Sequence, residues 1–417
     1  MHPFFMDKLY AGSDPIGQIA EYIVAVLNTG VHVYHVAPVF SVMEVECVKM
    51  MGRGFGFKDE DIDGTLNPGG TMSNIMALMA ARHEHFPHVR QEGWRPEDQP
   101  VAFTAQQSHY SINRGAMTAG MGMQNMIQIP SDRWTGQMEI NALEDAIQEQ
   151  IEKGKHPFFL NTMAGSTVMG AFDDHHKMSE ISKKYNLWHH VDGCWGGFLG
   201  WASGDNRERL MGGIEKADSV SINAHKGFGV PLQCALLVTN KKNGALKASN
   251  SSSADYLFHE SEYSKYDIGD KTLSCGRKAD GFKFWLWMKR HGLKEMTRIA
   301  DSALEKAEYI TKKIEEQSDK FTMVNKPMGT NVCFWYIPPA FRNAPYTDEH
   351  KTAVHKLIFE RMQQQGTILV QHNPLPEFDL PNFFRLVLKS ENANTEDMDY
   401  LLSEIDRLGA DITSAEL

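Results

Sequence analysis

Short apolar runs alternate with amphipathic stretches through the middle of this chain. Runs rich in β-branched or aromatic residues lie at 157–163 (PFFLNTM), 186–192 (NLWHHVD), 218–223 (DSVSIN) and 235–240 (ALLVTN), and each has the length of a buried strand. The segment 175–186 between the first two runs has its polar and apolar residues at helical spacing. Strands that alternate with helices predict an α/β fold with a mainly parallel central sheet covered on both faces.

The pattern changes near residue 292. A long helical stretch at 293–317 is followed by strand-like runs at 330–338, 366–371 and 382–388 and by a terminal helix near 395–408. This order predicts a smaller C-terminal α+β domain. The first residues form an arm with a helix over 15–27. The predicted division is an N-terminal arm at 1–48, a large domain at 49–291 and a small domain at 292–417.

Composition and charge exclude several classes of protein. The chain has 417 residues, of which 42% are hydrophobic and 23% charged, as is typical of a globular protein. A net charge of -11 with no run of basic residues argues against a nucleic-acid partner. No apolar run approaches the roughly 18 residues of a membrane span, and the N-terminus lacks the pattern of a secretory signal, so we expect a cytoplasmic protein.

Cysteine and histidine spacing gives no metal site. The five cysteines contain no CxxC pair, so the sequence predicts neither a disulfide framework nor a zinc knuckle, and a reducing compartment fits. His83, His85 and His88 are close enough in sequence to suggest zinc, but they lack the i, i+4 spacing of a helical metal face. We interpret them as a solvated helix end.

The strongest local signal for chemistry is the motif SINAHKG at 221–227, which places Lys226 directly after a strand. Most lysines are solvated surface charges, but groups just beyond the carboxyl ends of strands in an open α/β sheet face the ligand crevice. A lysine there can form a Schiff base with an aldehyde cofactor such as pyridoxal 5'-phosphate (PLP). That cofactor also needs a carboxylate at its pyridine nitrogen, an aromatic side chain over its ring and a phosphate cradle.

Each of these partners has a candidate. Asp192 ends the strand 186–192 and either caps a turn or meets a cation such as a protonated pyridine nitrogen. The loop NPGGTMSN at 67–74 runs into a helix and can present backbone N–H groups to an anion, although a capped turn looks the same. His109 is either a partly buried histidine or the residue that covers the ring. The order of these motifs along the chain favours the cofactor interpretation.

At these residues the chain resembles the group II PLP-dependent decarboxylases, and within them the branch of animal-type glutamate and cysteine sulfinate decarboxylases. The resemblance covers practically the whole chain and includes YNLWHHVD and the segments 256–271 and 275–292. It implies PLP as the cofactor and the type I, aspartate-aminotransferase-like fold. It also implies a homodimer with active sites at the subunit interface.

The resemblance also implies roles for individual residues. Lys226 matches the lysine that attaches the cofactor, Asp192 the partner of the pyridine nitrogen and His109 the residue stacked on the ring. The positions that match other cofactor contacts are Gly70, Thr71, Asn223 and His225 for the phosphate and Thr167 for the ring. Arg385 matches the arginine that holds the substrate's α-carboxylate, and Tyr256 matches the tyrosine of a mobile loop that protonates Cα.

The substrate is the open question. In relatives, residues 28–40 line the side-chain pocket, and Gly30 and His32 stand where glutamate decarboxylases carry Asn and Phe. Lys8 stands where relatives often have glutamine and could pair with an acidic side chain. These residues favour an acidic L-amino acid, namely cysteine sulfinate, cysteate, aspartate or glutamate. An aminotransferase, an aromatic amino acid decarboxylase or an inactive relative remain as alternatives.

Overall fold

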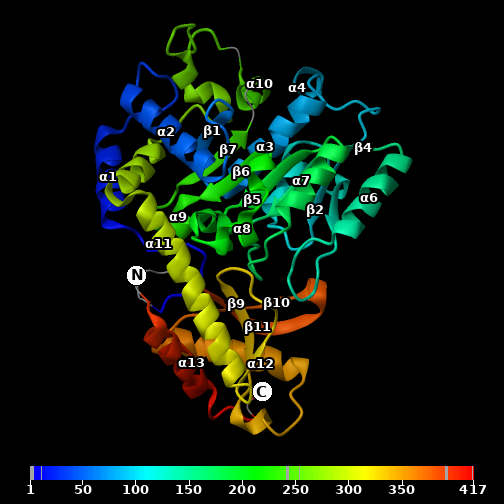
Figure 1. Cartoon of the computed structure of the whole chain (residues 1–417), viewed down its shortest axis with the longest axis vertical. Helices are drawn as coiled ribbons and strands as arrows, with labels where there is room; N and C mark the ends of the chain where they lie inside the picture. The colour runs from blue at the N-terminus through cyan, green and yellow to red at the C-terminus, as the bar shows by residue number, and fades with distance from the viewer. Residues whose placement is uncertain (1–3, 11, 241–243, 253, 390–392, 416) are drawn as a thin grey trace.

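A seven-stranded sheet lies at the centre of the larger part of the molecule (Figure 1). The computed structural model describes residues 4–10, 12–240, 244–252, 254–389, 393–415 and 417. In spatial order the strands are β1 (Ile62–Asn67), β7 (Ala235–Asn240), β6 (Ser219–Asn223), β5 (Trp188–Gly193), β4 (His156–Met163), β2 (Pro100–Ala105) and β3 (Met126–Ile129).

Most of this sheet is parallel, as the sequence predicts. Strands β6, β5, β4, β2 and β3 pair in parallel, whereas β7 is antiparallel to both of its neighbours, β6 and β1. The link between β6 and β7 covers only residues 224–234, with the short helix α9 (Ala224–Gly227) inside it. A parallel connection needs a crossover of about a dozen or more residues, so this short link returns the chain in the opposite direction.

Helices cover both faces of the sheet, which confirms the predicted layers. On one face, α3 packs across β4 to β7 and is flanked by α5 and α10. On the other face lie α2, α6, α7 and the first part of α11. The bounds of these helices are α2 (Pro38–Gly54), α3 (Gly70–His85), α5 (Ser111–Thr118), α6 (Ile140–Glu152), α7 (His175–Lys184), α10 (Ala245–Asn250) and α11 (Asp280–Glu316), and the larger part also contains α4 (Val89–Glu92) and α8 (Asp205–Met211).

The C-terminal part is a second, antiparallel sheet with helices against it (Figure 1). Its strands are β10 (Gln371–Leu375), β11 (Leu380–Val387), β9 (Asn331–Tyr336) and β8 (Phe321–Met323), and its helices are α12 (Asp348–Gln365) and α13 (Thr395–Gly409). The predicted strand at 366–371 is wrong, because β10 begins only at Gln371. The apolar residues before it pair instead with the N-terminal segment, where Met6 N–H donates to Leu369 O.

The two parts are joined by α11, which runs from the upper to the lower half of Figure 1. Its helical geometry is interrupted at Gly292, where φ is 70°. The predicted helix at 15–27 is present as α1 (Pro15–Leu27), and Asp14 caps it by accepting a hydrogen bond from Ile16 N–H at 2.8 Å. The boundary predicted at residue 48, between the arm and the large domain, falls inside α2. The division into domains stays a prediction. Within the described ranges, no helix is both long and apolar enough to cross a bilayer.

Candidate active site

The carboxyl ends of β1, β2, β4, β5 and β6 meet at one edge of the large sheet, and a cavity of about 240 Å³ lies there. In an open α/β sheet this edge is where ligands bind. The seven predicted site residues that line the cavity are Gly70, Thr71, His109, Thr167, Asp192, Asn223 and Lys226. Residues that are up to 156 positions apart in the sequence are therefore brought together by the strand order.

Asp192 is a buried carboxylate at the end of β5. Its Oδ2 accepts a hydrogen bond from Asn74 Nδ2 at 2.8 Å, and its Oδ1 accepts from Cys194 N–H at 3.0 Å and from the Ser221 hydroxyl at 3.3 Å. All three donors are neutral groups. A buried anion without a cationic partner is costly, so this carboxylate suits a ligand that brings a positive charge, such as a protonated pyridine ring.

The pKa of Asp192 shows that the carboxyl is ionised. Burial by itself would raise this pKa, but the nearby His109 and His190 and the hydrogen bond from Cys194 outweigh burial and hold the pKa below its ordinary value. Burial lowers the pKa of His109. At neutral pH the cavity therefore pairs a charged carboxylate with a neutral imidazole.

The glycine-rich loop forms a cradle at the start of α3. Gly70 is the first residue of this helix, and a Cβ atom placed on it would lie 2.3 Å from Cys194 Sγ and 3.0 Å from the side-chain amide of Asn223. The buried Asn223 Oδ1 has no hydrogen-bond partner among the described residues. A phosphate oxygen accepts hydrogen bonds, so the Nδ2 donor of Asn223, not its Oδ1, fits a phosphate group beside the open start of α3.

Lys226 follows β6 and lines the same cavity as Asp192. Its amine forms no hydrogen bond or ion pair with any residue that the structure describes, so it is available to react with an aldehyde. The neighbouring His225 is not on the cavity wall, and its Nδ1 lies 2.8 Å from Cys234 O and 3.1 Å from Cys234 N. Burial lowers the pKa of His225 to about 4. Its contact with a phosphate stays a prediction.

Arg385 reaches this region from β11 of the smaller sheet. Its Nη1 donates to Thr167 O at 2.8 Å and its Nη2 donates to Asp7 O at 2.8 Å. Its Nε is buried and has no partner among the described residues. Because Thr167 lines the cavity, the structure places the predicted carboxylate-binding arginine directly beside it.

The remaining predicted residues do not line this cavity. Tyr256 lies in a turn after α10 and is 84% exposed. Lys8 Nζ donates to Gln371 Oε1 at 2.5 Å and lies 3.1 Å from Asp7 Oδ2, so its charge already has a carboxylate partner. Within one chain, the structure therefore does not bring either side chain to Lys226.

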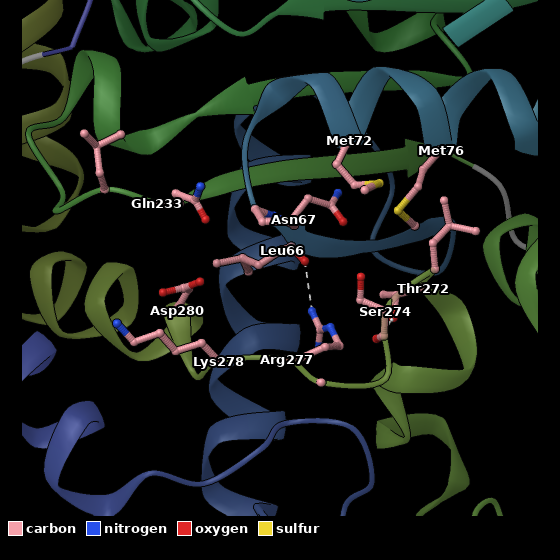
Figure 2. Close-up of a pocket in the computed structure, with 14 residues that line it drawn as sticks. Leu66, Asn67, Met72, Met76, Gln233, Thr272, Ser274, Arg277, Lys278 and Asp280 are labelled. Atoms are coloured by element: carbon pink, nitrogen blue, oxygen red, sulfur yellow. Dashed lines mark hydrogen bonds between the residues drawn. The ribbon is translucent and has the colours of Figure 1, made fainter. Parts of the chain in front are cut away.

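Gly30 and His32 line neither the first cavity nor a second cavity of about 310 Å³ (Figure 2). Val31, between them, donates its N–H to Arg277 O at 2.9 Å, and Arg277 lines this second cavity. Figure 2 shows Arg277 donating to the Leu66 carbonyl, at 2.9 Å, below two methionines of α3. Asn67 and Pro68 line the second cavity whereas Gly70 and Thr71 line the first, so the two cavities flank one loop.

The structure also adds residues that the sequence interpretation did not single out. Asn74 and Ser111 line the first cavity, and Asn74 binds Asp192. Asn74 belongs to the quoted motif 67–74 and follows Gly70 by four residues, which is one helical turn. This spacing could have identified Asn74 from the sequence, because it places Asn74 and Gly70 on one face of α3.

A parallel sheet with a lysine, a buried aspartate and a glycine-rich helix start at its carboxyl edge defines the class of PLP-dependent enzymes with the aspartate-aminotransferase-like fold. The family model described as "Pyridoxal-dependent decarboxylase conserved domain" matches residues 1–337. The chain belongs to this family. It is a PLP-dependent decarboxylase, PLP is its cofactor and its substrate is an amino acid.

Solved structures agree with this assignment. The crystal structure of mouse CSAD in apo form has a TM-score of 0.91 and 33% sequence identity, and the match covers 98% of this chain and 85% of that chain. This likeness supports the branch of glutamate and cysteine sulfinate decarboxylases. Oryza sativa TDC with PLP and tryptamine has a TM-score of 0.87 at 19% identity, over 97% of this chain and 83% of that chain, and shows the shared fold alone.

Proposed function

We propose that this enzyme decarboxylates an acidic L-amino acid, namely cysteine sulfinate, cysteate, aspartate or glutamate, to the corresponding amine and carbon dioxide. The observation that carries the chemistry is the single cavity that holds the free amine of Lys226 and the buried, ionised carboxylate of Asp192. The acidic class of substrate is supported by the 33% identity to mouse CSAD over nearly the whole chain.

Different residues of the cavity hold different parts of the cofactor. When bound, PLP supplies an electron sink for the pair that remains on Cα after the carboxylate leaves. Asp192 keeps the pyridine nitrogen protonated, His109 covers the ring, and the start of α3 with Thr71 binds the phosphate. The ionised state of Asp192 suits this role, because a neutral partner would not hold a charged ring nitrogen.

Two further residues act on the substrate. Arg385 binds the α-carboxylate and orients the bond that breaks, and its buried, unpartnered Nε supports this role. Tyr256 donates the proton that Cα takes up after carbon dioxide leaves. Because Tyr256 is exposed in one chain, this role requires either movement of its loop or a second subunit.

The enzyme would act as a homodimer in the cytoplasm. The apolar residues Ile19, Tyr22 and Val26 of α1 are more than half exposed, which supports a partner surface there. All five cysteines are free, which fits a reducing compartment. In a dimer, the side-chain pocket would combine Gly30 and His32 of one subunit with the cavity of the other.

Carbon dioxide release by the purified, PLP-loaded protein tests the proposal. The panel contains glutamate, aspartate, cysteine sulfinate, cysteate and aromatic amino acids, and we expect release from at least one acidic substrate. Turnover of aromatic substrates alone would reject the acidic class. Formation of a keto acid without carbon dioxide would indicate an aminotransferase. No reaction with any substrate would indicate an inactive relative.

A further inference from the structure

A chain of hydrogen bonds leads from Asp192 into the sheet through Asn74 and His190. Asn74 Nδ2 donates to Asp192 Oδ2 at 2.8 Å, and Asn74 Oδ1 lies 3.0 Å from His190 Nε2. His190 Nδ1 lies 2.8 Å from Ser219 Oγ, which accepts a hydrogen bond from Trp188 Nε1 at 2.8 Å. All five side chains are nine-tenths or more buried, and they come from β5, β6 and α3.

The direction of these bonds is fixed by the carboxylate end, because Asp192 Oδ2 can only accept, so Asn74 Nδ2 donates to it and Asn74 Oδ1 faces His190 Nε2. The indole N–H of Trp188 can only donate, so Ser219 accepts from it and has its own hydrogen left for His190 Nδ1. Burial lowers the pKa of His190 to about 4, so the ring is neutral and carries its single hydrogen on Nε2. That hydrogen goes to Asn74 Oδ1, because the NH₂ group of Asn74 faces Asp192.

The same amide also orients the Ser111 hydroxyl, which lies beside His109. Asn74 Nδ2 donates its second hydrogen to Ser111 Oγ at 2.9 Å. The Ser111 hydroxyl lies 2.8 Å from His109 Nδ1, and Ser111 backbone N–H donates to that nitrogen at 3.2 Å. His109 Nδ1 is therefore an acceptor, and the neutral ring carries its hydrogen on Nε2.

We propose that Asn74 is a positioning residue of the active site, whose one amide orients the carboxylate of Asp192, stabilises its ionised form and orients the Ser111 hydroxyl beside His109. This inference rests on the proposed function, in which Asp192 and His109 hold the PLP ring. Both hydrogens and the oxygen of the amide are used, so no shorter side chain can replace it. The titratable groups around Asp192 are His109, His190, Cys194 and Lys226.

Titration of the apo-protein with PLP at several pH values tests this role. For Asn74→Ala we expect affinity about 10- to 100-fold weaker than wild type, as when a buried charge loses a hydrogen bond. The loss should grow as the pH falls from about 8 to 6. Loss of the amide removes one hydrogen bond to the ionised carboxyl and so raises the pKa of Asp192, and a protonated carboxyl must release its proton before it can pair with a protonated ring.

Two control variants separate positioning from stability. Asn161 is also buried, and its Nδ2 donates to Thr104 Oγ1 at 3.0 Å, but it forms no hydrogen bond with Asp192 or Ser111 among the described residues. Asn161→Ala should lower the unfolding midpoint and leave PLP affinity and its pH profile unchanged. Ser111→Ala should reduce kcat through His109 without the pH-dependent loss of affinity.

The outcomes distinguish this inference from the proposed function. If Asn74→Ala fails to fold, Asn74→Ser is expected to show the same pH-dependent loss, since a serine cannot reach both partners. Wild-type affinity with a flat pH profile in the folded Asn74 variants, while Asp192→Asn binds PLP weakly, would overturn the role of Asn74 alone. Unchanged affinity in Asp192→Asn as well would overturn the placement of Asp192 against the cofactor and the inference with it.

Discussion

The cavity around Asp192 and the surface around Tyr256 differ in how completely one chain builds them. Asp192 is 8% exposed and holds three hydrogen bonds from neutral donors, whereas Tyr256 is 84% exposed. The ends of strands in the large sheet form the cavity around Asp192, and the sheet holds them rigidly. The surface around Tyr256 belongs to a polar segment between helices. The cofactor site is thus built by the fold of the single chain, whereas the residues proposed for proton delivery and substrate selection lie in segments outside this cavity.

The largest effect is expected from Lys226→Ala. This variant removes the cavity's free amine and should abolish both turnover and the covalent attachment of the cofactor. Borohydride reduction followed by mass spectrometry measures the attachment. Lys312→Ala, at a lysine that is 75% exposed on its side chain, is the control and should behave as wild type. A reducible link that persists without Lys226 would assign the role to another lysine.

Asp192→Asn should lower turnover by several orders of magnitude and leave the fold intact, because an uncharged partner does not keep the pyridine ring protonated. The matched control is Asp173→Asn. Asp173 is also buried, but it accepts N–H groups from Met138 and Met163 and does not line the cavity. Single-turnover rates and unfolding midpoints should therefore separate the two variants. Near-normal rates in Asp192→Asn would mean that another group holds the ring nitrogen.

Tyr256→Phe tests the role proposed for the exposed Tyr256 side chain. We expect slower protonation of Cα and a shift of products toward aldehyde or transamination, with no change in the unfolding midpoint, since the side chain is 84% exposed. Product analysis by chromatography measures this partition. Tyr263→Phe, in the same segment and stacked on Tyr34, should leave the products unchanged. An unaltered rate and a single amine product from Tyr256→Phe would show that a different acid acts.

The smallest effect is expected at the residues proposed for substrate choice. Lys8→Gln should reduce kcat/KM for acidic substrates more than for neutral ones, by at most the roughly 10- to 200-fold that a lost charged hydrogen bond allows. Because Lys8 already contacts Asp7 and Gln371, we expect the lower end of this range. Equal losses on both substrate classes would make Lys8 a purely structural residue.

Gly30→Asn combined with His32→Phe should shift the ratio of kcat/KM toward glutamate over cysteine sulfinate. The two residues flank Val31, which donates to Arg277 at the second cavity, so this shift would also show that the second cavity and the first work together in the assembled enzyme. The ratio in each single variant is the control. An unchanged ratio in the double variant would place the side-chain pocket elsewhere.

The local pattern of apolar and polar residues predicted most of the helices and strands. The helix at 15–27 and the strands near 157–163, 218–223 and 235–240 agree with α1, β4, β6 and β7, because burial and periodicity act over a few neighbouring residues. The strand predicted at 366–371 failed because its apolar residues pair with the N-terminal segment, and no local signal reports such a distant partner.

The sequence by itself determined the cofactor chemistry, since Lys226, Asp192 and the glycines before α3 each follow a recognisable strand or begin a helix. Only the tertiary structure decided how these residues are held. The order of the strands places Met163, Asp192 and Ser221 side by side, and packing of α3 on the sheet brings Asn74 to Asp192. Hydrogen-bond direction, burial and the resulting pKa values depend on contacts between residues far apart in the chain, which no local pattern encodes.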